Sequence, residues 1–266
     1  MIPWKNVLTN IMKTKRNCYY RLVGLFLLLA ISGKASAQLH LKANVQNMHL
    51  WRGMEVTDGM VLTTDLSVTD ARQHFRAGVW GGASMDGSYK EFNNYLSYTL
   101  HRFSVSVWDT YNFSPEADYN NQEFFNYKAK ETGRFVDATL SYTVSEKYPL
   151  FISWSTILYG RDRDGLNTQN RYSTFVYTEY PVFCDEHWEV RPGIGTAFAF
   201  SPGKDADGTS SSSHFYGDTA GVIHLSVATT YHLTTSRQAF PVTVLALWNP
   251  QSNKGYLQIG IQLLSF

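Results

Sequence analysis

The sequence predicts an all-β protein, an antiparallel transmembrane β-barrel of about twelve strands behind an N-terminal export signal. Three observations predict it. Apolar and polar residues alternate with a period of two along most of the chain. Short and long connections follow each other alternately between these segments. The composition is rich in aromatic residues (15%) and poor in charged ones (17%). An apolar band outside, a polar lumen inside and aromatic residues at the strand ends are typical of such barrels.

The composition also excludes several classes of protein. Soluble domains usually carry about 25% charged residues, more than the 17% found here. The formal net charge of +1 and the lack of a basic block argue against a nucleic-acid binder. The longest apolar run, 22–31, has ten residues, whereas a spanning helix needs roughly 20.

The N-terminus predicts a signal peptide over residues 1–37. A basic segment containing Lys13 and Arg21 precedes the apolar run 22–31, and Ala35-Ser36-Ala37 fits the cleavage pattern. Cleavage after Ala37 leaves residues 38–266 as the barrel; a buried helix or a membrane anchor is the alternative reading of 1–37. One cysteine, Cys184, then remains, which excludes a disulfide-stapled secreted domain.

Twelve segments of the mature chain alternate with period two and are expected to form strands. In each, one face is aliphatic and the other carries mainly Ser, Thr, Asn, Gln and Gly. A soluble secreted β-sandwich would also alternate, but its outward face would carry Lys and Glu. The count could also be ten or fourteen. The segments are 39–45, 62–68, 75–85, 93–100, 103–107, 136–144, 150–158, 172–180, 188–198, 223–233, 242–249 and 257–263.

The connections support a barrel in the outer membrane of a Gram-negative bacterium. With a periplasmic N-terminus, the longest connections all lie outside, as outer-membrane barrels require. The expected inner turns are 69–74, 101–102, 145–149, 181–187 and 234–239. The expected outer loops are 52–59, 86–91, 114–133, 160–170, 201–218 and 250–255.

Two residues depart from this pattern. Asp109 faces the lipid by phase, where a charge is costly; either a bulge turns it inward or its strand leaves the membrane first. The terminal Phe266 resembles the signal recognised by the barrel-assembly machinery, which is therefore an expected partner beside the outer-membrane lipids. Phe266 is out of phase with the apolar face of its strand, and a bulge would restore the phase.

Charged residues along the predicted polar faces mark a candidate pore. They either select small solutes by charge or brace a narrow, filled barrel in pairs. About eight strands leave an interior that side chains fill, and 16–18 leave an open channel, so twelve favours neither. The residues are Lys42, Asp65, Arg76, Asp137, Glu179, Glu189 and Arg191.

His224 and Ser226 are weak catalytic candidates. Their spacing places both side chains on one face of a strand, and a Ser deprotonated by His is the centre of many hydrolases. Outer-membrane phospholipases and lipid A deacylases carry such a pair facing the membrane, with Asn after the Ser. Here the pair faces the lumen and Val227 follows. Two polar lumen residues are the simpler interpretation, so no enzymatic activity is expected.

Two outer loops carry the pattern Asp-x-Asp-Gly. Asp162 with Asp164, and Asp205 with Asp207, are weak candidates for calcium. Neither has the full set of ligands of a calcium loop, and Asp and Gly favour turns by themselves. No cofactor is expected. The loops 114–133 and 201–218 offer an alternative function, surface binding or adhesion.

The segment Leu50-Trp51-Arg52-Gly53, followed by Phe75-Arg76-Ala77-Gly78-Val79-Trp80-Gly81, resembles the opening of the Gcw-chp family of exported bacterial proteins. The resemblance covers about residues 43–112. It implies an outer-membrane barrel without an assigned activity. It also implies a structural role for Arg52 at the outer rim, where it would pair with loop carboxylates or lipid phosphates. MltA-interacting and OmpV-type barrels are more distant alternatives.

The expected function is therefore passive: a narrow channel for small solutes, or a structural barrel. The alternatives are the surface binding module and the lipid hydrolase.

Overall fold

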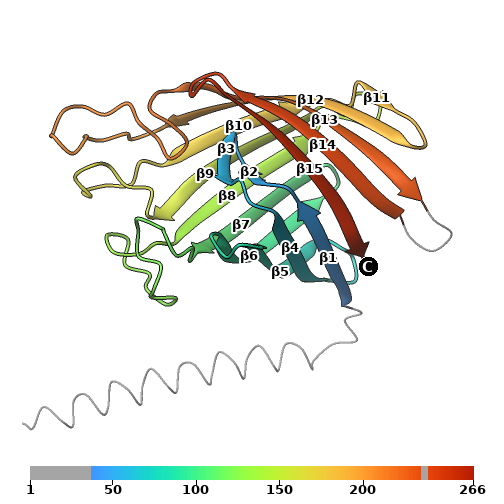
Figure 1. The fold of residues 1–266 in the computed structure, drawn as a ribbon, viewed down its shortest axis with the longest axis horizontal. Coiled ribbons are helices and arrows are strands. Elements are labelled where there is room, and N and C mark those ends of the chain that lie inside the picture. The colour runs from blue at the N-terminus through green and yellow to red at the C-terminus, as the bar shows by residue number, and fades with distance from the viewer. Residues whose placement is uncertain (1–36, 235–238) are drawn as a thin grey trace, which may run out of the picture. The chain divides into compact units, whose positions relative to one another are not determined.

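The computed structural model describes residues 37–234 and 239–266. Apart from Ala37, the predicted signal peptide lies outside the described residues, as does most of the turn predicted at 234–239. Within the described part of the chain, no helix is long and apolar enough to cross a membrane. The described chain is a single β structure (Figure 1).

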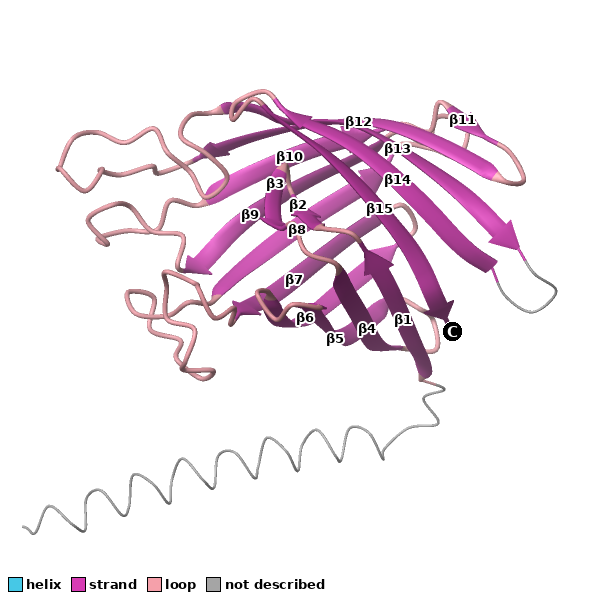
Figure 2. Ribbon diagram, viewed as in Figure 1, coloured by secondary structure: helices cyan, strands magenta, loops and turns pink. Residues whose placement is uncertain are grey.

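Twelve antiparallel strands form one closed barrel, which confirms the predicted fold (Figure 2). Closure comes from pairing of the first strand with the last, and of β10 with β12. In chain order the strands are β1 (Gln38–Gln46), β4 (Val61–Thr69), β5 (Phe75–Ser84), β6 (Lys90–Leu100), β7 (Phe103–Asn112), β8 (Phe135–Thr143), β9 (Phe151–Gly160), β10 (Ser173–Glu179), β12 (Trp188–Ala199), β13 (Gly221–Thr234), β14 (Ala239–Asn249) and β15 (Lys254–Ser265).

Three short strands are not among the twelve strands of the barrel wall. β11 (Phe183–Cys184) adds to the edge of β12. β2 (His49–Trp51) and β3 (Met54–Thr57) pair only with each other and form a hairpin between β1 and β4.

The two faces of the wall differ as the alternation predicts. Along β4, Thr63 and Ser67 point into the lumen and are buried, while Leu62 and Leu66 point outward and are 42% and 44% exposed. Extended exposed apolar patches mark surfaces that contact a membrane or another protein. The same outward apolar row recurs on β15, the last strand.

The connections divide the barrel into two ends. The long-loop end carries the connections 47–60, 85–89, 113–134, 161–172, 200–220 and 250–253, and the short-turn end carries the others. This is the division that the sequence predicts.

A bulge lies near the end of β15, as expected from the phase of Phe266. The pairing with β1 shifts between Ala43 and Asn44, so that β15 contributes one residue more than β1. Phe266 then exchanges backbone hydrogen bonds with Leu41 and shares its outward face. The terminal aromatic ring is 66% exposed.

Asp109 is not turned inward by a bulge, which removes one of the two expected explanations. It pairs in register with Asn94 and Val136 on the outward face. Its carboxylate lies 2.9 Å from Arg134 Nη1 and accepts a 2.7 Å hydrogen bond from the Tyr127 hydroxyl. The loop between β7 and β8 therefore folds over the outer wall and neutralises this charge.

The segment expected as an outer loop at 52–59 is instead part of the β2–β3 hairpin, and this hairpin enters the lumen. Its turn consists of Arg52 and Gly53, with φ of 48° and 83°. Two consecutive positive φ values are those of a type I′ turn, the commonest two-residue hairpin turn. A Cβ on Gly53 would collide with the carbonyl of Ile223 on β13. The tip thus touches the wall, where only glycine fits.

Candidate functional site: a cavity inside the barrel

The tip of the β2–β3 hairpin is anchored to two strands of the wall and to the loop before β13. Arg52 Nη2 donates to Asp137 Oδ2 on β8 at 2.5 Å, and its Nη1 donates to the Tyr216 hydroxyl at 2.8 Å. Asn249, on β14, donates its side-chain amide to the Gly53 carbonyl at 3.0 Å. Because β8 and β14 lie far apart in strand order, the hairpin reaches across the lumen.

The anchor differs from the expected position of Arg52 at the rim. The Arg52 and Asp137 side chains are only 13% and 4% exposed. Burial opposes the charged form of Arg52, but the Asp137 carboxylate and the Tyr216 hydroxyl outweigh it and raise the pKa above its ordinary value. Arg52 pairs with a carboxylate, as expected, but with one on a strand inside the barrel.

The hairpin packs against a buried apolar cluster inside the barrel. Trp51 and Met54 lie against this cluster, which also receives Phe215 from the loop before β13. The rings of Trp51 and Phe215 meet edge to face at 6.0 Å. The buried members of the cluster are Phe135, Ile157, Phe175, Ala197, Tyr216 and Ile223. The lumen of this barrel is therefore partly filled by its own hairpin and loop.

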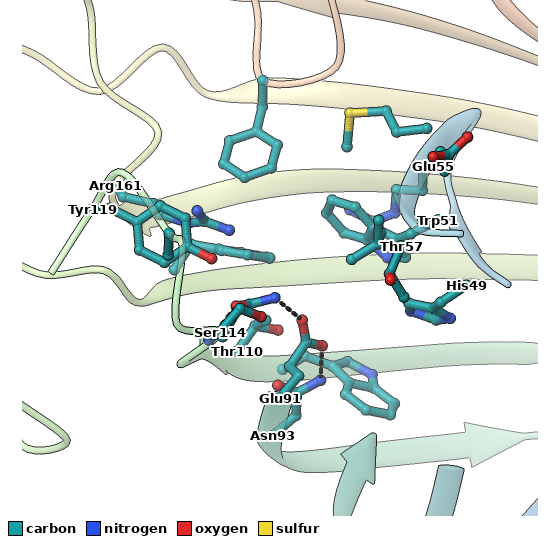
Figure 3. Close-up of a pocket in the computed structure, with 18 of the residues that line it drawn as sticks. His49, Trp51, Glu55, Thr57, Glu91, Asn93, Thr110, Ser114, Tyr119 and Arg161 are labelled. Atoms are coloured by element: carbon teal, nitrogen blue, oxygen red, sulfur yellow. Dashed lines mark hydrogen bonds between the residues drawn. The ribbon is translucent and has the colours of Figure 1, made fainter. Parts of the chain in front are cut away.

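Beside the hairpin, a cavity of about 780 Å³ lies toward the long-loop end, and Trp51 and Met54 also line it. The hairpin, the wall from β5 to β8 and the loops that contain Tyr119 and Phe215 line it (Figure 3). Its six aromatic side chains are Trp51, Trp80, Trp108, Tyr119, Phe135 and Phe215. Its charged side chains are Arg52, Glu55, Asp58, Glu91, Glu116, Asp137 and Arg161. Size and composition are those of small-molecule sites, which combine apolar walls with a few fixed polar groups.

Glu91 presents a carboxylate to this cavity from the first lumen position of β6. Asn93 donates its amide to Oε1 at 2.8 Å, and Asn112, on β7, donates to Oε2 at 3.4 Å (Figure 3). The register places these three side chains on one face, since Glu91 lies opposite Asn112. Two amides from neighbouring strands thus fix the orientation of the acid.

Arg161 lines the same cavity and follows immediately after β9. Its guanidinium carbon lies 3.7 Å from the Tyr119 ring centroid, 5.3 Å from that of Phe135 and 5.1 Å from that of Phe215. Burial lowers the pKa of Arg161 and raises that of Tyr119 from their ordinary values. Aromatic faces hold the cation here.

The charged residues predicted for the lumen all project from its inner face. On neighbouring strands, Lys42 lies opposite Asp65, and Asp65 accepts a 2.9 Å hydrogen bond from the Tyr95 hydroxyl. Arg76 lies opposite Thr69 and Ser97. These residues lie nearer the short-turn end than the cavity does.

A second group forms a compact ion-pair network. Arg191 donates to Glu179 at 3.1 Å and also to Glu189. The Tyr177 hydroxyl donates to the other Glu179 oxygen at 2.9 Å. The interpretation that lumen charges brace the wall in pairs fits these residues and Asp137, whereas Lys42 and Arg76 make no ion pair within the described chain.

His224 and Ser226 do lie in contact, with 2.9 Å between Nε2 and Oγ. The pair faces the lumen beside Tyr177. Within the described residues the other ring nitrogen, Nδ1, is buried without a hydrogen-bond partner. The carboxylate that orients the histidine in most Ser–His sites is therefore not in place.

The two Asp-x-Asp-Gly segments form turns. Asp162 accepts hydrogen bonds from the backbone and hydroxyl of Ser173 at 2.7 and 2.8 Å. Asp164 accepts from Thr168 and Gln169, and Asp207 from Thr209. The Asp205 backbone closes its own turn with Gly208 and Thr209. In residues 37–234 and 239–266, no three His, Cys, Asp or Glu side chains are grouped to hold a metal.

The two long loops that suggested surface binding both contribute to the lumen. Tyr119 from 114–133 and Phe215 from 201–218 line the cavity. The part of 114–133 that contains Phe124 and Tyr127 turns outward, and both rings cover Arg134. Binding of an external ligand by these loops stays a prediction.

The site residues that sequence reasoning missed lie mainly in segments read as loops. Glu91 and Arg161 fall within the expected loops 86–91 and 160–170, and Trp51 lies one residue before another. A two-residue Arg-Gly turn between Trp51 and Met54 was the available signal for a hairpin. Nothing in the sequence indicates that this hairpin folds inward.

No family model and no curated protein matches the sequence. The resemblance to the Gcw-chp family is therefore not shown. Among solved structures, the chain is similar to the COG4313 outer membrane channel from Pseudomonas putida F1, with a TM-score of 0.38 and 13% identity. The similarity covers 86% of this chain and 93% of that one. Values this low carry no argument about function.

Proposed function

We propose that this chain is an outer-membrane barrel whose partly filled lumen passes small polar solutes. The observation that carries the proposal is the cavity of about 780 Å³ inside a closed wall with polar side chains within and apolar ones outside. Closure of the barrel leaves no backbone group of the wall unpaired in lipid. The outward apolar side chains match the hydrocarbon core. Below the cavity, Asp65 and Arg76 continue the polar lumen toward the short-turn end.

The hairpin explains why such a channel would be narrow. Trp51 and Met54 pack against the buried apolar cluster and fill part of the lumen, so a solute is left with the cavity that Glu91 and Arg161 line. Three residues of the Gcw-chp resemblance build this plug: Trp51 packs, Arg52 anchors and Gly53 turns. The second segment of the resemblance, residues 75–81, lies on β5 in the wall. Membership of that family is part of this proposal, as is recognition of the exposed Phe266 by the assembly machinery.

Conductance of the refolded mature chain, residues 38–266, in a planar bilayer tests the proposal. We expect discrete steps, with an ion preference that shifts when Arg76 is replaced by Ala. Arg102, on a turn outside the lumen, provides a matched control: Arg102→Ala should leave the preference unchanged. Barrels that insert with an intact fold and never conduct would overturn the channel.

A lipid hydrolase is the second candidate, and the contact of 2.9 Å between His224 and Ser226 is the observation that favours it. The lumen position of the pair and its unpartnered Nδ1 weigh against it. Release of fatty acid from phospholipid vesicles by the refolded barrel, lost in Ser226→Ala but kept in Ser155→Ala, would support the enzyme. Equal release by the two variants would exclude it.

A further inference from the structure

We propose that the cavity binds an organic cation, a compact solute that carries an ammonium or quaternary ammonium group. The inference rests on the proposed function in one respect: the solute enters the cavity through the lumen of the barrel. Three features of the lining support it, namely its charge, its aromatic rings and the fixed carboxylate of Glu91.

The lining carries more negative than positive charge. Five carboxylates and two guanidinium groups line the cavity. One carboxylate, Asp137, is taken by its ion pair with Arg52. Glu55 and Asp58 on the hairpin and Glu116 on the loop are exposed, so they attract cations toward the opening. A cavity lined by one sign of charge with low-dielectric walls concentrates ions of the other sign.

The aromatic rings of the same lining already hold cationic groups. The Arg52 guanidinium carbon lies 4.6 Å from the Trp51 ring centroid, and that of Arg161 lies 3.7 Å from Tyr119. Both distances are within the range of favourable cation–π contacts. Trp80 and Trp108 line the cavity on β5 and β7 without a guanidinium over them among the described contacts. They offer two further indole groups of the kind that binds ammonium best.

Glu91 supplies the anionic contact at these rings. Trp80 lies opposite Asn93, the next lumen residue after Glu91 on β6, and Thr110 of the neighbouring strand also lies opposite Asn93. The amides of Asn93 and Asn112 donate to both carboxylate oxygens and hold the acid in one orientation beside the cavity that it lines. A cation in this cavity would meet the oriented Glu91 carboxylate, which Figure 3 shows with its Asn93 contact, in the same lining as two indole rings.

Binding of choline to refolded residues 38–266 tests the inference by isothermal titration calorimetry. A polyoxyethylene detergent is required, because phosphocholine and maltoside headgroups would compete with the probes. We expect saturable binding of choline, and weaker binding or none for glucose and acetate. Glu91→Gln keeps the size of the side chain and removes its charge, and should weaken choline binding by about tenfold.

Glu146→Gln is the matched control, because Glu146 is exposed on a turn at the short-turn end. It should bind choline as the unmodified chain does. Glucose or acetate bound more tightly than choline would overturn the inference, and so would a Glu91→Gln barrel that is folded by circular dichroism and binds choline unchanged.

Calorimetry tests the cation site and the bilayer measurement tests the channel, so either hypothesis can fail without the other. A barrel that binds choline but never conducts keeps the cation site and loses the channel. A barrel that conducts but does not bind choline loses the site and keeps the channel.

Discussion

Arg52 and Asp137 are separated by 85 residues in sequence and meet inside the barrel at 2.5 Å. Arg52 lies in the turn of the β2–β3 hairpin, and Asp137 lies on β8. Both side chains are nearly buried. The contact joins the inserted hairpin to the wall, and both residues line the cavity that remains in the lumen.

Removing Arg52 alone should cost more stability than replacing both Arg52 and Asp137 by apolar residues. Arg52→Ala leaves the Asp137 carboxylate buried and unpaired, which typically costs about 3–5 kcal/mol. We expect the unfolding free energy in urea to fall by roughly that amount, and the double variant Arg52→Met with Asp137→Leu to recover part of the loss. Lys128 and Glu131 form an exposed pair at 3.0 Å, so Lys128→Ala should change stability very little. Equal losses for Arg52→Ala and Lys128→Ala would mean that the hairpin is not anchored by charge.

A comparison of Gly53 with Gly87 separates two reasons why a position requires glycine, namely a positive φ and a close contact with backbone. Both have positive φ, 83° and 78°, but a Cβ on Gly53 meets the backbone of Ile223, whereas one on Gly87 meets nothing within 4 Å. Gly87→Ala should therefore cost only the strain of the left-handed conformation, about 1 kcal/mol. Gly53→Ala should cost this and also displace the hairpin tip, which would appear as new protease cleavage near residue 53. A Gly53→Ala barrel as stable and as resistant as Gly87→Ala would contradict the tight contact.

Arg134 organises the part of loop 113–134 that covers the outer wall. Its side chain is 1% exposed, pairs with Asp109 at 2.9 Å and donates to the Phe124 carbonyl at 2.7 Å. Arg134→Met keeps the length of the side chain but loses the ion pair and the hydrogen bond. We expect proteolysis of the loop to become about tenfold faster while the strands stay protected. Lys128→Met in the same loop, where the side chain is 75% exposed, should leave the rate unchanged; similar rates for both variants would show that Arg134 does not hold the loop.

The sequence predicted the wall well because alternation is local. Each strand shows its two faces within its own residues, as with Leu62 and Thr63 on β4. The bulge near Phe266 followed from the same rule, since the last strand was out of phase by one residue.

The interior escaped prediction because it depends on contacts between distant segments. β2 and β3 have three and four residues, too few for alternation to reveal, and their inward fold depends on Asp137, Tyr216 and Asn249. Glu91 and Arg161 lie at strand ends, where boundaries are least certain. The lumen charges were placed on the correct face, but their pairing, as in Arg191 with Glu179 and Glu189, required the register.

Removing the hairpin gives the sharpest test of its role in the lumen. Replacing residues 49–57 by a Gly-Ser linker of equal length takes Trp51 and Met54 out of the apolar cluster, while Phe215 and the strands remain. If the hairpin limits the channel, single-channel conductance should rise several-fold, because the open cross-section grows. The same replacement at 205–209, an exposed turn of the loop before β13, should leave conductance unchanged. Arg52→Ala keeps the hairpin but removes its contacts with Asp137 and Tyr216, so the conductance of this variant should flicker between the low and the high level. Equal conductance of all three variants and the unmodified chain would mean that solutes do not pass the hairpin.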